Sequence, residues 1–265
     1  MSRTQYPLII KITTAAAFLV MIAINALANI LPINGITTGA VSDSYPNLFA
    51  PAGLTFTIWG LIYVLLLIFV LDQTGLFRRL NEQQQQLLRR ISPYFIISSL
   101  ANTLWIICWH YGFISLSLLP MLAILLSLLT IMTRFDPSPM TIKDELLIRL
   151  PFSVYTGWIT VAMIANITTA LVSQNWTGWG ISEEIWTIVA LAAGLLIGTI
   201  TILKRQDIAY GLVLVWAYIG IAIKRYDAAP RHSLIILAVF IAIAIFLLAD
   251  FYIAACRFLQ NRKLT

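Results

Sequence analysis

The chain has 265 residues, of which 60% are hydrophobic and only 11% are charged, and its net charge is +6. Soluble globular domains carry about 25% charged residues, and the mean hydropathy here is +0.89. This composition excludes a water-soluble protein. The basic residues lie in short loops between apolar runs, where they orient a membrane protein in the lipid bilayer, and this placement argues against nucleic acid as a partner.

Eight apolar segments follow one another along the chain, with lengths close to the ~20 residues that a spanning helix needs. No strand-like alternation of polar and apolar residues competes with them. We therefore predict an all-α fold, a polytopic transmembrane bundle of about eight helices. The seventh segment is the shortest, so the sequence leaves open whether it crosses fully. The segments cover residues 8–31, 54–72, 91–111, 113–133, 146–173, 184–203, 207–223 and 231–257.

The first segment has two interpretations. Arg3 and Lys11 precede an apolar run, and residues 26–28 (Ala-Leu-Ala) resemble the small-residue site at which a signal peptide is cleaved. The apolar run continues past that site to Leu31, and we therefore favour a helix that is retained. Cleavage would remove one helix and leave the orientation of the others unchanged.

The distribution of Lys and Arg predicts the orientation of the bundle. Every Lys and Arg outside the loop 224–232 is predicted to lie on the same side of the membrane as the N-terminus. This bias favours cytoplasmic N- and C-termini, and we expect an integral, multi-pass protein of a bacterial cell membrane. Lys224, Arg225 and Arg231 are the exceptions. Either the segment before them does not span fully, or a late loop tolerates them, which is the interpretation we favour.

The loops carry local signals for helix starts and stops. The Gln-rich stretch 78–90 predicts a short surface helix between two spans, and residues 135–139 predict a stop. Thr141 with Asp144 resembles a capping box that opens the fifth span. Ser182, followed by two glutamates, is typical of a helix N-terminus.

Residues suited to covalent, metal or phosphate chemistry are sparse. The chain has no glycine-rich phosphate loop and no Cys/His cluster at metal spacing, so we expect no cofactor and no metal. Cys108 and Cys256 lie in apolar runs, and we expect free thiols. The acidic residues lie at helix ends except Asp250, which we expect to reach the inner headgroups. This pattern argues against a proton-coupled transporter, which needs an ionisable group deep in the bilayer.

The interior does contain rows of amide and aromatic side chains at helical spacing. An asparagine in hydrocarbon must find a partner, so we expect these rows to face one another inside the bundle and line a pocket. Stacking rings with a few amide donors would suit a flat, mostly apolar ligand. Alternatively, the amides only bond neighbouring helices together, at ~0.6 kcal/mol each. Trp176, Trp179 and Trp186 fit an interfacial belt. The rows contain Phe56, Trp59 and Tyr63; Ser98, Asn102, Trp105 and Trp109; and Tyr155, Trp158, Ala162 and Asn166, with Asn25, Asn29, Trp216 and Tyr218 beside them.

At these positions the chain resembles the tryptophan-rich sensory protein family, also called the translocator protein or peripheral benzodiazepine receptor family. That family opens its second helix with Pro-Pro-Gly-Trp-x-Phe followed by a Trp and a Tyr. It carries Asn-x-x-Trp on its third helix, and Pro-Tyr with a later Trp and Asn on its fifth. The matching residues here are Pro51, Gly53, Phe56, Trp59 and Tyr63; Asn102 and Trp105; and Pro151, Tyr155, Trp158 and Asn166.

The resemblance covers roughly residues 8–173 and implies a long, divergent member. It implies a five-helix translocator-like core in residues 1–173, with three additional transmembrane helices in residues 174–265. It also implies a receptor or translocator for a porphyrin, a sterol or a similar planar molecule. The ligand-binding residues would be Pro51, Phe56, Trp59, Tyr63, Asn102, Trp105, Tyr155, Trp158 and Asn166.

Two other functions stay open. One is a membrane permease or transport-complex subunit for a lipid or peptide, which the three further helices and the basic loop suggest. The other is an enzyme that modifies a porphyrin, which is the least favoured because no base or metal site is evident. The oligomeric state, including a homodimer, is also left open.

Overall fold

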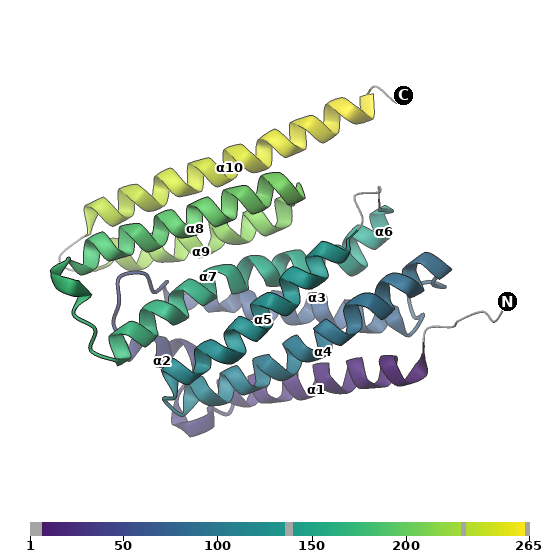
Figure 1. Cartoon of the computed structure of the whole chain (residues 1–265), viewed down its shortest axis with the longest axis horizontal. Coiled ribbons are helices and arrows are strands. Elements are labelled where there is room, and N and C mark those ends of the chain that lie inside the picture. The colour runs from purple at the N-terminus through teal and green to yellow at the C-terminus, as the bar shows by residue number, and fades with distance from the viewer. Residues whose placement is uncertain (1–6, 136–139, 229–231, 263–265) are drawn as a thin grey trace. The chain divides into compact units, whose positions relative to one another are not determined.

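The computed structural model describes residues 7–135, 140–228 and 232–262, and the predicted all-α fold is confirmed (Figure 1). Short 3₁₀ turns join some of the helices, including η2 (Gly53–Thr57), and a π-helical turn at Glu145–Arg149 leads into α7. The helices are α1 (Leu8–Asn29), α2 (Thr38–Asp43), α3 (Ile58–Gln73), α4 (Glu82–His110), α5 (Ile114–Arg134), α6 (Ile142–Asp144), α7 (Leu150–Ser173), α8 (Glu183–Arg205), α9 (Ile208–Tyr226) and α10 (Ser233–Arg262).

Within the described ranges, eight helices are long and apolar enough to cross a membrane. They match the eight predicted segments, and the second and fifth run through their short turns as Gly53–Gln73 and Ile142–Ser173. The seventh, α9, is 19 residues long and meets the same length and hydropathy requirement. The chain is therefore an integral, multi-pass membrane protein.

The Gln-rich stretch before the third span does not form the separate surface helix that its composition predicted. It is the first part of α4, which continues without a break through Pro93 to His110. The reason lies at the N-terminus of α4, where the Asn81 side chain accepts from the Gln84 N–H and the Gln84 side chain accepts from the Asn81 N–H. This capping box and a run of good helix formers extend the span beyond its apolar part.

The other local signals have mixed outcomes. Thr141 caps α6, because its hydroxyl oxygen accepts from the Asp144 N–H at 3.2 Å. Ser182 caps α8 by accepting from the Ile185 N–H. Both cysteines are free thiols, as predicted. Arg3, Arg231, Lys263 and residues 136–139 of the predicted stop lie outside the described residues.

The chain divides into two compact units. Unit 1 comprises Met1–Val41 and Trp59–Thr156, and unit 2 comprises Ser42–Ile58 and Gly157–Thr265. The boundary falls within α7, so the start of that helix belongs to unit 1 and the rest to unit 2. The predicted division after residue 173 stays a prediction.

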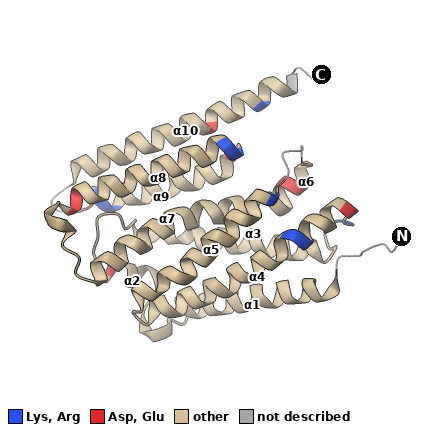
Figure 2. Ribbon diagram, viewed as in Figure 1, with Lys and Arg blue, Asp and Glu red and all other residues tan. Residues whose placement is uncertain are grey.

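Unit 1 is built on α1, α4 and α5, with α4 packed against both of the others. Phe69, Phe95 and Phe152 meet edge to face at its core, with ring centroids 4.7–5.8 Å apart. The charged residues gather at one end of this unit (Figure 2). They lie at the start of α1 and α4, the ends of α3 and α5, and in the α6 region, so the spans between carry almost none.

Unit 2 contains α8, α9 and α10, and α10 packs on both of the others. Helix α9 also contacts residues that precede α3. Gly220 accepts from the Ala52 N–H at 3.0 Å, and the Trp216 indole donates to the Thr55 carbonyl at 3.0 Å. A Cβ at Gly220 would overlap the Thr55 hydroxyl, so only glycine allows this close approach.

Candidate functional site

An aromatic–amide cluster occupies unit 1 and contains five of the nine predicted ligand-binding residues. Trp59 stacks on Tyr63 with ring centroids 5.5 Å apart and lies 6.0 Å from Trp105. Tyr155 meets Trp59 edge to face at 5.9 Å. These residues come from α3, α4 and α7, so part of each predicted row meets in this cluster.

Asn102 is the polar centre of this cluster and is completely buried. Its side-chain oxygen accepts from the Asn25 amide at 2.7 Å, and its side-chain nitrogen donates to the Tyr155 hydroxyl at 3.1 Å. The chain of bonds therefore joins α1, α4 and α7 through three side chains. As expected for amides in hydrocarbon, these groups face the bundle and pair with one another.

The geometry of the cluster is that of a packed polar junction. The Trp105 ring stacks on Trp109 and packs at a tilt against Trp59, and the Asn102 oxygen already has a protein partner. This arrangement favours the structural alternative considered for the amides, in which they hold neighbouring helices together. Any ligand here would have to separate rings that now touch.

The other four predicted residues lie in unit 2. Phe56 is in the 3₁₀ turn η2 and meets the Trp158 ring edge to face at 5.9 Å. The shared α-helical face predicted for Phe56, Trp59 and Tyr63 is thus interrupted, because α3 begins only at Ile58. Pro51 and Asn166 are both buried, the latter on α7.

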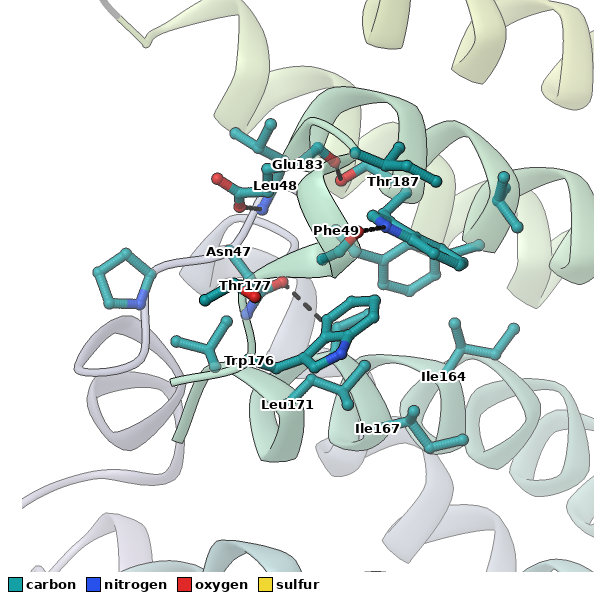
Figure 3. A pocket seen from close by; sticks show the side chains of 18 of the residues that line it. Asn47, Leu48, Phe49, Ile164, Ile167, Leu171, Trp176, Thr177, Glu183 and Thr187 are labelled. Carbon is teal, nitrogen blue, oxygen red and sulfur yellow. Dashed lines mark hydrogen bonds between the residues drawn. The ribbon is translucent and has the colours of Figure 1, made fainter. Parts of the chain in front are cut away.

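Unit 2 also contains a pocket that the sequence did not indicate. Its volume is ≈ 620 Å³, and its walls come from the loop 46–49, from α7 and α8, and from the turn between those two helices (Figure 3). The apolar walls are formed mainly by Phe49, Ile164, Ile167, Leu171, Trp176 and Trp186.

Trp176 and Trp186 form one side of this pocket, and Trp179 completes a cluster of three indoles beside it. Trp176 lies 5.1 Å from Trp186, and Trp179 contacts both rings edge to face. The Trp186 N–H donates to the Gly178 carbonyl at 3.0 Å, which fixes this indole. Gly178 has φ 68°, and a Cβ there would press on the Trp186 ring at 3.3 Å, so the turn needs glycine.

Polar groups line the pocket from its loop, from α7, from the turn after α7 and from the start of α8. The Asn47 side-chain oxygen accepts from the Ala50 N–H at 2.8 Å and from the Thr168 hydroxyl at 3.3 Å. The Glu183 carboxylate accepts from the Leu48 N–H at 2.9 Å. These hydrogen bonds connect the loop to α7 and α8. They fix the walls of the pocket relative to one another, so the pocket is pre-formed.

Sequence reasoning missed this pocket because its walls meet only through long-range contacts. Residues 46–49 are separated from Glu183 by well over a hundred positions. The one local signal was the group of tryptophans at 176, 179 and 186, which was assigned to an interfacial belt. In the structure Trp176 and Trp186 line a cavity, a role that is compatible with a boundary position.

The sequence profile described as TSPO-like protein matches residues 11–252, which is nearly the whole chain. The chain belongs to the TSPO-like protein family. The match extends well beyond the first five spans that carry the motif resemblance, and α8 and α9 of this TSPO-like chain fall entirely within it. Comparisons with curated proteins and with solved structures gave no match.

Proposed function

We propose that this TSPO-like chain is a membrane receptor or translocator that binds a hydrophobic planar ligand, such as a porphyrin or a sterol, non-covalently within the helical bundle. The observation that carries the proposal is the pocket of unit 2. Its volume of ≈ 620 Å³ lies within the ~300–1,000 Å³ of small-molecule sites in general. Family membership and the membrane-spanning fold support the same function.

The chemistry of the pocket suits a flat apolar molecule. Trp176 and Trp186 supply stacking faces, and Phe49 with the aliphatic side chains of α7 and α8 supplies further apolar wall. Glu183 places a carboxylate at the rim, where it can accept a hydrogen bond from a ligand hydroxyl or N–H group. A few polar groups around an apolar cavity orient a ligand without requiring it to be charged.

The nine residues predicted from the sequence remain a second candidate location for the same ligand. Five of them form the aromatic–amide cluster of unit 1, and four lie in unit 2. A ligand at the cluster of unit 1 would need Trp59 and Trp105 to move apart, whereas the pocket of unit 2 offers space as it stands. The two locations therefore differ in whether binding requires rearrangement.

Tryptophan fluorescence of the detergent-purified protein during titration with protoporphyrin should show saturable quenching. Ala190 lines the pocket and Ala192, on the same helix, does not. Ala190→Phe should fill the cavity and weaken binding by at least ~10-fold, which corresponds to about 1.4 kcal/mol. Ala192→Phe adds the same side chain to an exposed face of α8 and should leave the affinity unchanged.

The outcomes of this titration test the location of the ligand site separately from ligand binding itself. Saturable quenching that Ala190→Phe leaves intact but Trp105→Ala abolishes would move the site to unit 1. Non-saturable quenching in the unmodified protein, with protoporphyrin and equally with a fluorescent sterol, would contradict ligand binding altogether.

A permease or transport-complex subunit for a lipid or peptide is the second candidate. The observation that favours the lipid form is the side of the pocket formed by Ile167, Leu171 and Val189, which are all exposed. An acyl chain in the bilayer could enter there without crossing water. Competition of a lysophospholipid with protoporphyrin, together with lipid transfer across reconstituted vesicles, would support this candidate over a receptor.

We further propose that both termini face the cytoplasm of a bacterial cell. The gathering of charge at one end of unit 1 supports this orientation through the positive-inside rule. In a background with both native cysteines replaced by serine, a membrane-impermeant maleimide should label Gln174→Cys in intact cells and should not label Gln83→Cys. Both positions are exposed. The reverse labelling pattern would invert the topology.

A further inference from the structure

Asp250 lies in α10 with a side chain that is buried inside unit 2. Only 5% of its surface is exposed, and neither carboxylate oxygen has a hydrogen-bond partner among the described residues. The expectation that it reaches the inner headgroups is wrong, because α10 continues for three turns beyond it to Arg262 and its carboxylate rests on α9. A Cβ at Gly211 of α9 would overlap both of its oxygens.

Within the part of the chain that the structure describes, the groups around Asp250 do not supply a compensating cation. From α9, Asp207 adds a second acidic group, whose carboxylate is occupied by the Tyr210 N–H. The Tyr210 hydroxyl donates instead to Thr160 at 3.1 Å. On α8, Lys204 and Arg205 are exposed at the C-terminal end. On α10 itself, Arg257 donates to the Gln206 carbonyl.

An ionised carboxylate in this position would have almost no contact with solvent, and the described residues would give it neither a hydrogen bond nor a counter-ion. Burial of such a charge costs far more than burial of the neutral acid, so a buried and unpaired group neutralises instead. Ionisable groups inside membrane bundles are costly and commonly mark proton relays or transport pathways. Gly211 is consistent with a fitted site, because it leaves room for the carboxyl group against the α9 backbone.

We propose that Asp250 is a proton-binding site, which holds its proton while α10 packs on α9 at Gly211. Release transfers the proton to water and leaves both bonding electrons on the carboxylate. The resulting charge then faces the α9 backbone and Asp207, and so loosens the contact between α9 and α10. This inference goes beyond ligand binding, which requires no ionisable group, and it gives unit 2 an element that can respond to protons.

Infrared spectroscopy of the purified protein tests the protonation directly. The unmodified protein at neutral pH should show the C=O stretch of a protonated carboxylic acid, which disappears at alkaline pH. Asp250→Asn should remove this band, whereas Asp207→Asn, which alters the other buried carboxylate of the site, should retain it. A spectrum without the band in the unmodified protein, or a band that persists in Asp250→Asn, overturns the proposal.

Thermal unfolding as a function of pH tests the consequence for packing. A proton that the native state binds more tightly than the unfolded state contributes stability at acidic pH, and this contribution is lost as the pH rises. The midpoint of the unmodified protein should therefore fall towards alkaline pH, and that of Asp250→Asn should fall less. Equal pH dependence of the two proteins overturns the proposal.

A mutant cycle tests the contact and remains informative should Asp250→Asn fail to fold. Gly211→Ala should lower the unfolding midpoint of the unmodified protein, because the new methyl group displaces the carboxyl group. In an Asp250→Ala background the methyl group has room, so Gly211→Ala should change the midpoint much less. Additive effects of the two substitutions would contradict the contact on which the proposal depends.

Discussion

Replacement of Arg78 by alanine should lower the free energy of unfolding by about 3–5 kcal/mol. The Arg78 guanidinium donates to Asp72 through Nε at 3.1 Å and Nη2 at 2.9 Å, and to Asp144 through Nη1 at 2.6 Å. Asp72 lies in the last turn of α3, and its side chain is 1% exposed. Loss of the arginine would leave two carboxylates without their cation at the same end of unit 1, which is why the expected loss is large.

Arg78 remains charged throughout the accessible pH range. Burial disfavours its charge, but the hydrogen bonds with Asp72 and Asp144 outweigh that effect and raise the pKa of the guanidinium above its ordinary value. Arg78→Lys should recover only part of the stability, because an ammonium group cannot bridge both carboxylates with the same geometry.

Chemical unfolding in detergent, monitored by circular dichroism, measures these losses. Arg79→Ala is the matched control, since the neighbouring arginine is exposed and outside the carboxylate pair. A loss for Arg79→Ala as large as that for Arg78→Ala would attribute the effect to net charge and rule out the bridge.

Asn102→Leu should have the next largest effect, a loss of about 1–3 kcal/mol. The substitution keeps the branched shape of the side chain, but it removes the acceptor for the Asn25 amide and the donor to the Tyr155 hydroxyl in the interior of unit 1. Thr130→Leu on α5 provides the control, because the hydroxyl of that half-buried residue donates within its own helix, to Leu126.

A double substitution identifies the cause of that loss. Once Asn25→Leu has removed the first partner, Asn102→Leu should cost less than it does alone, because fewer buried groups are left unpaired. If Asn102→Leu abolishes porphyrin binding with no change in stability, the cluster would serve a ligand and not the junction between helices.

Much of the fold follows from hydrophobic run length. Each spanning helix must satisfy its own backbone, so apolar runs of about 20 residues predict helices with little ambiguity. The same rule underestimated the length of α4, because the polar first turns of that helix depend on capping by Asn81 and not on hydropathy. Amide placement was also predictable, because Asn25 and Asn102 have no satisfactory environment in lipid and therefore face inwards.

The parts that could not be predicted depend on contacts between distant segments. Asp250 looked like a residue near the end of its helix, and only the position of Gly211 shows that its carboxylate is enclosed. The pocket of unit 2 depends likewise on the Glu183 bond to the loop at Leu48. Helical periodicity shows on which face of its helix a residue lies. It does not show which other segment of the chain will pack against that face.

The hydrogen bonds that join residues 52–55, just before α3, to helix α9 have a consequence for biosynthesis. Thr55 and Trp216 are 161 residues apart, and everything in unit 1 is translated before α9 exists. The Ala52 N–H and the Thr55 carbonyl therefore lack their α9 partners while the nascent chain is still on the ribosome and α9 is not yet made. Unit 1 can already assemble in the bilayer during that time. Nascent chains arrested before Trp216 emerges should expose residues 52–55 to protease, and longer ones should protect them.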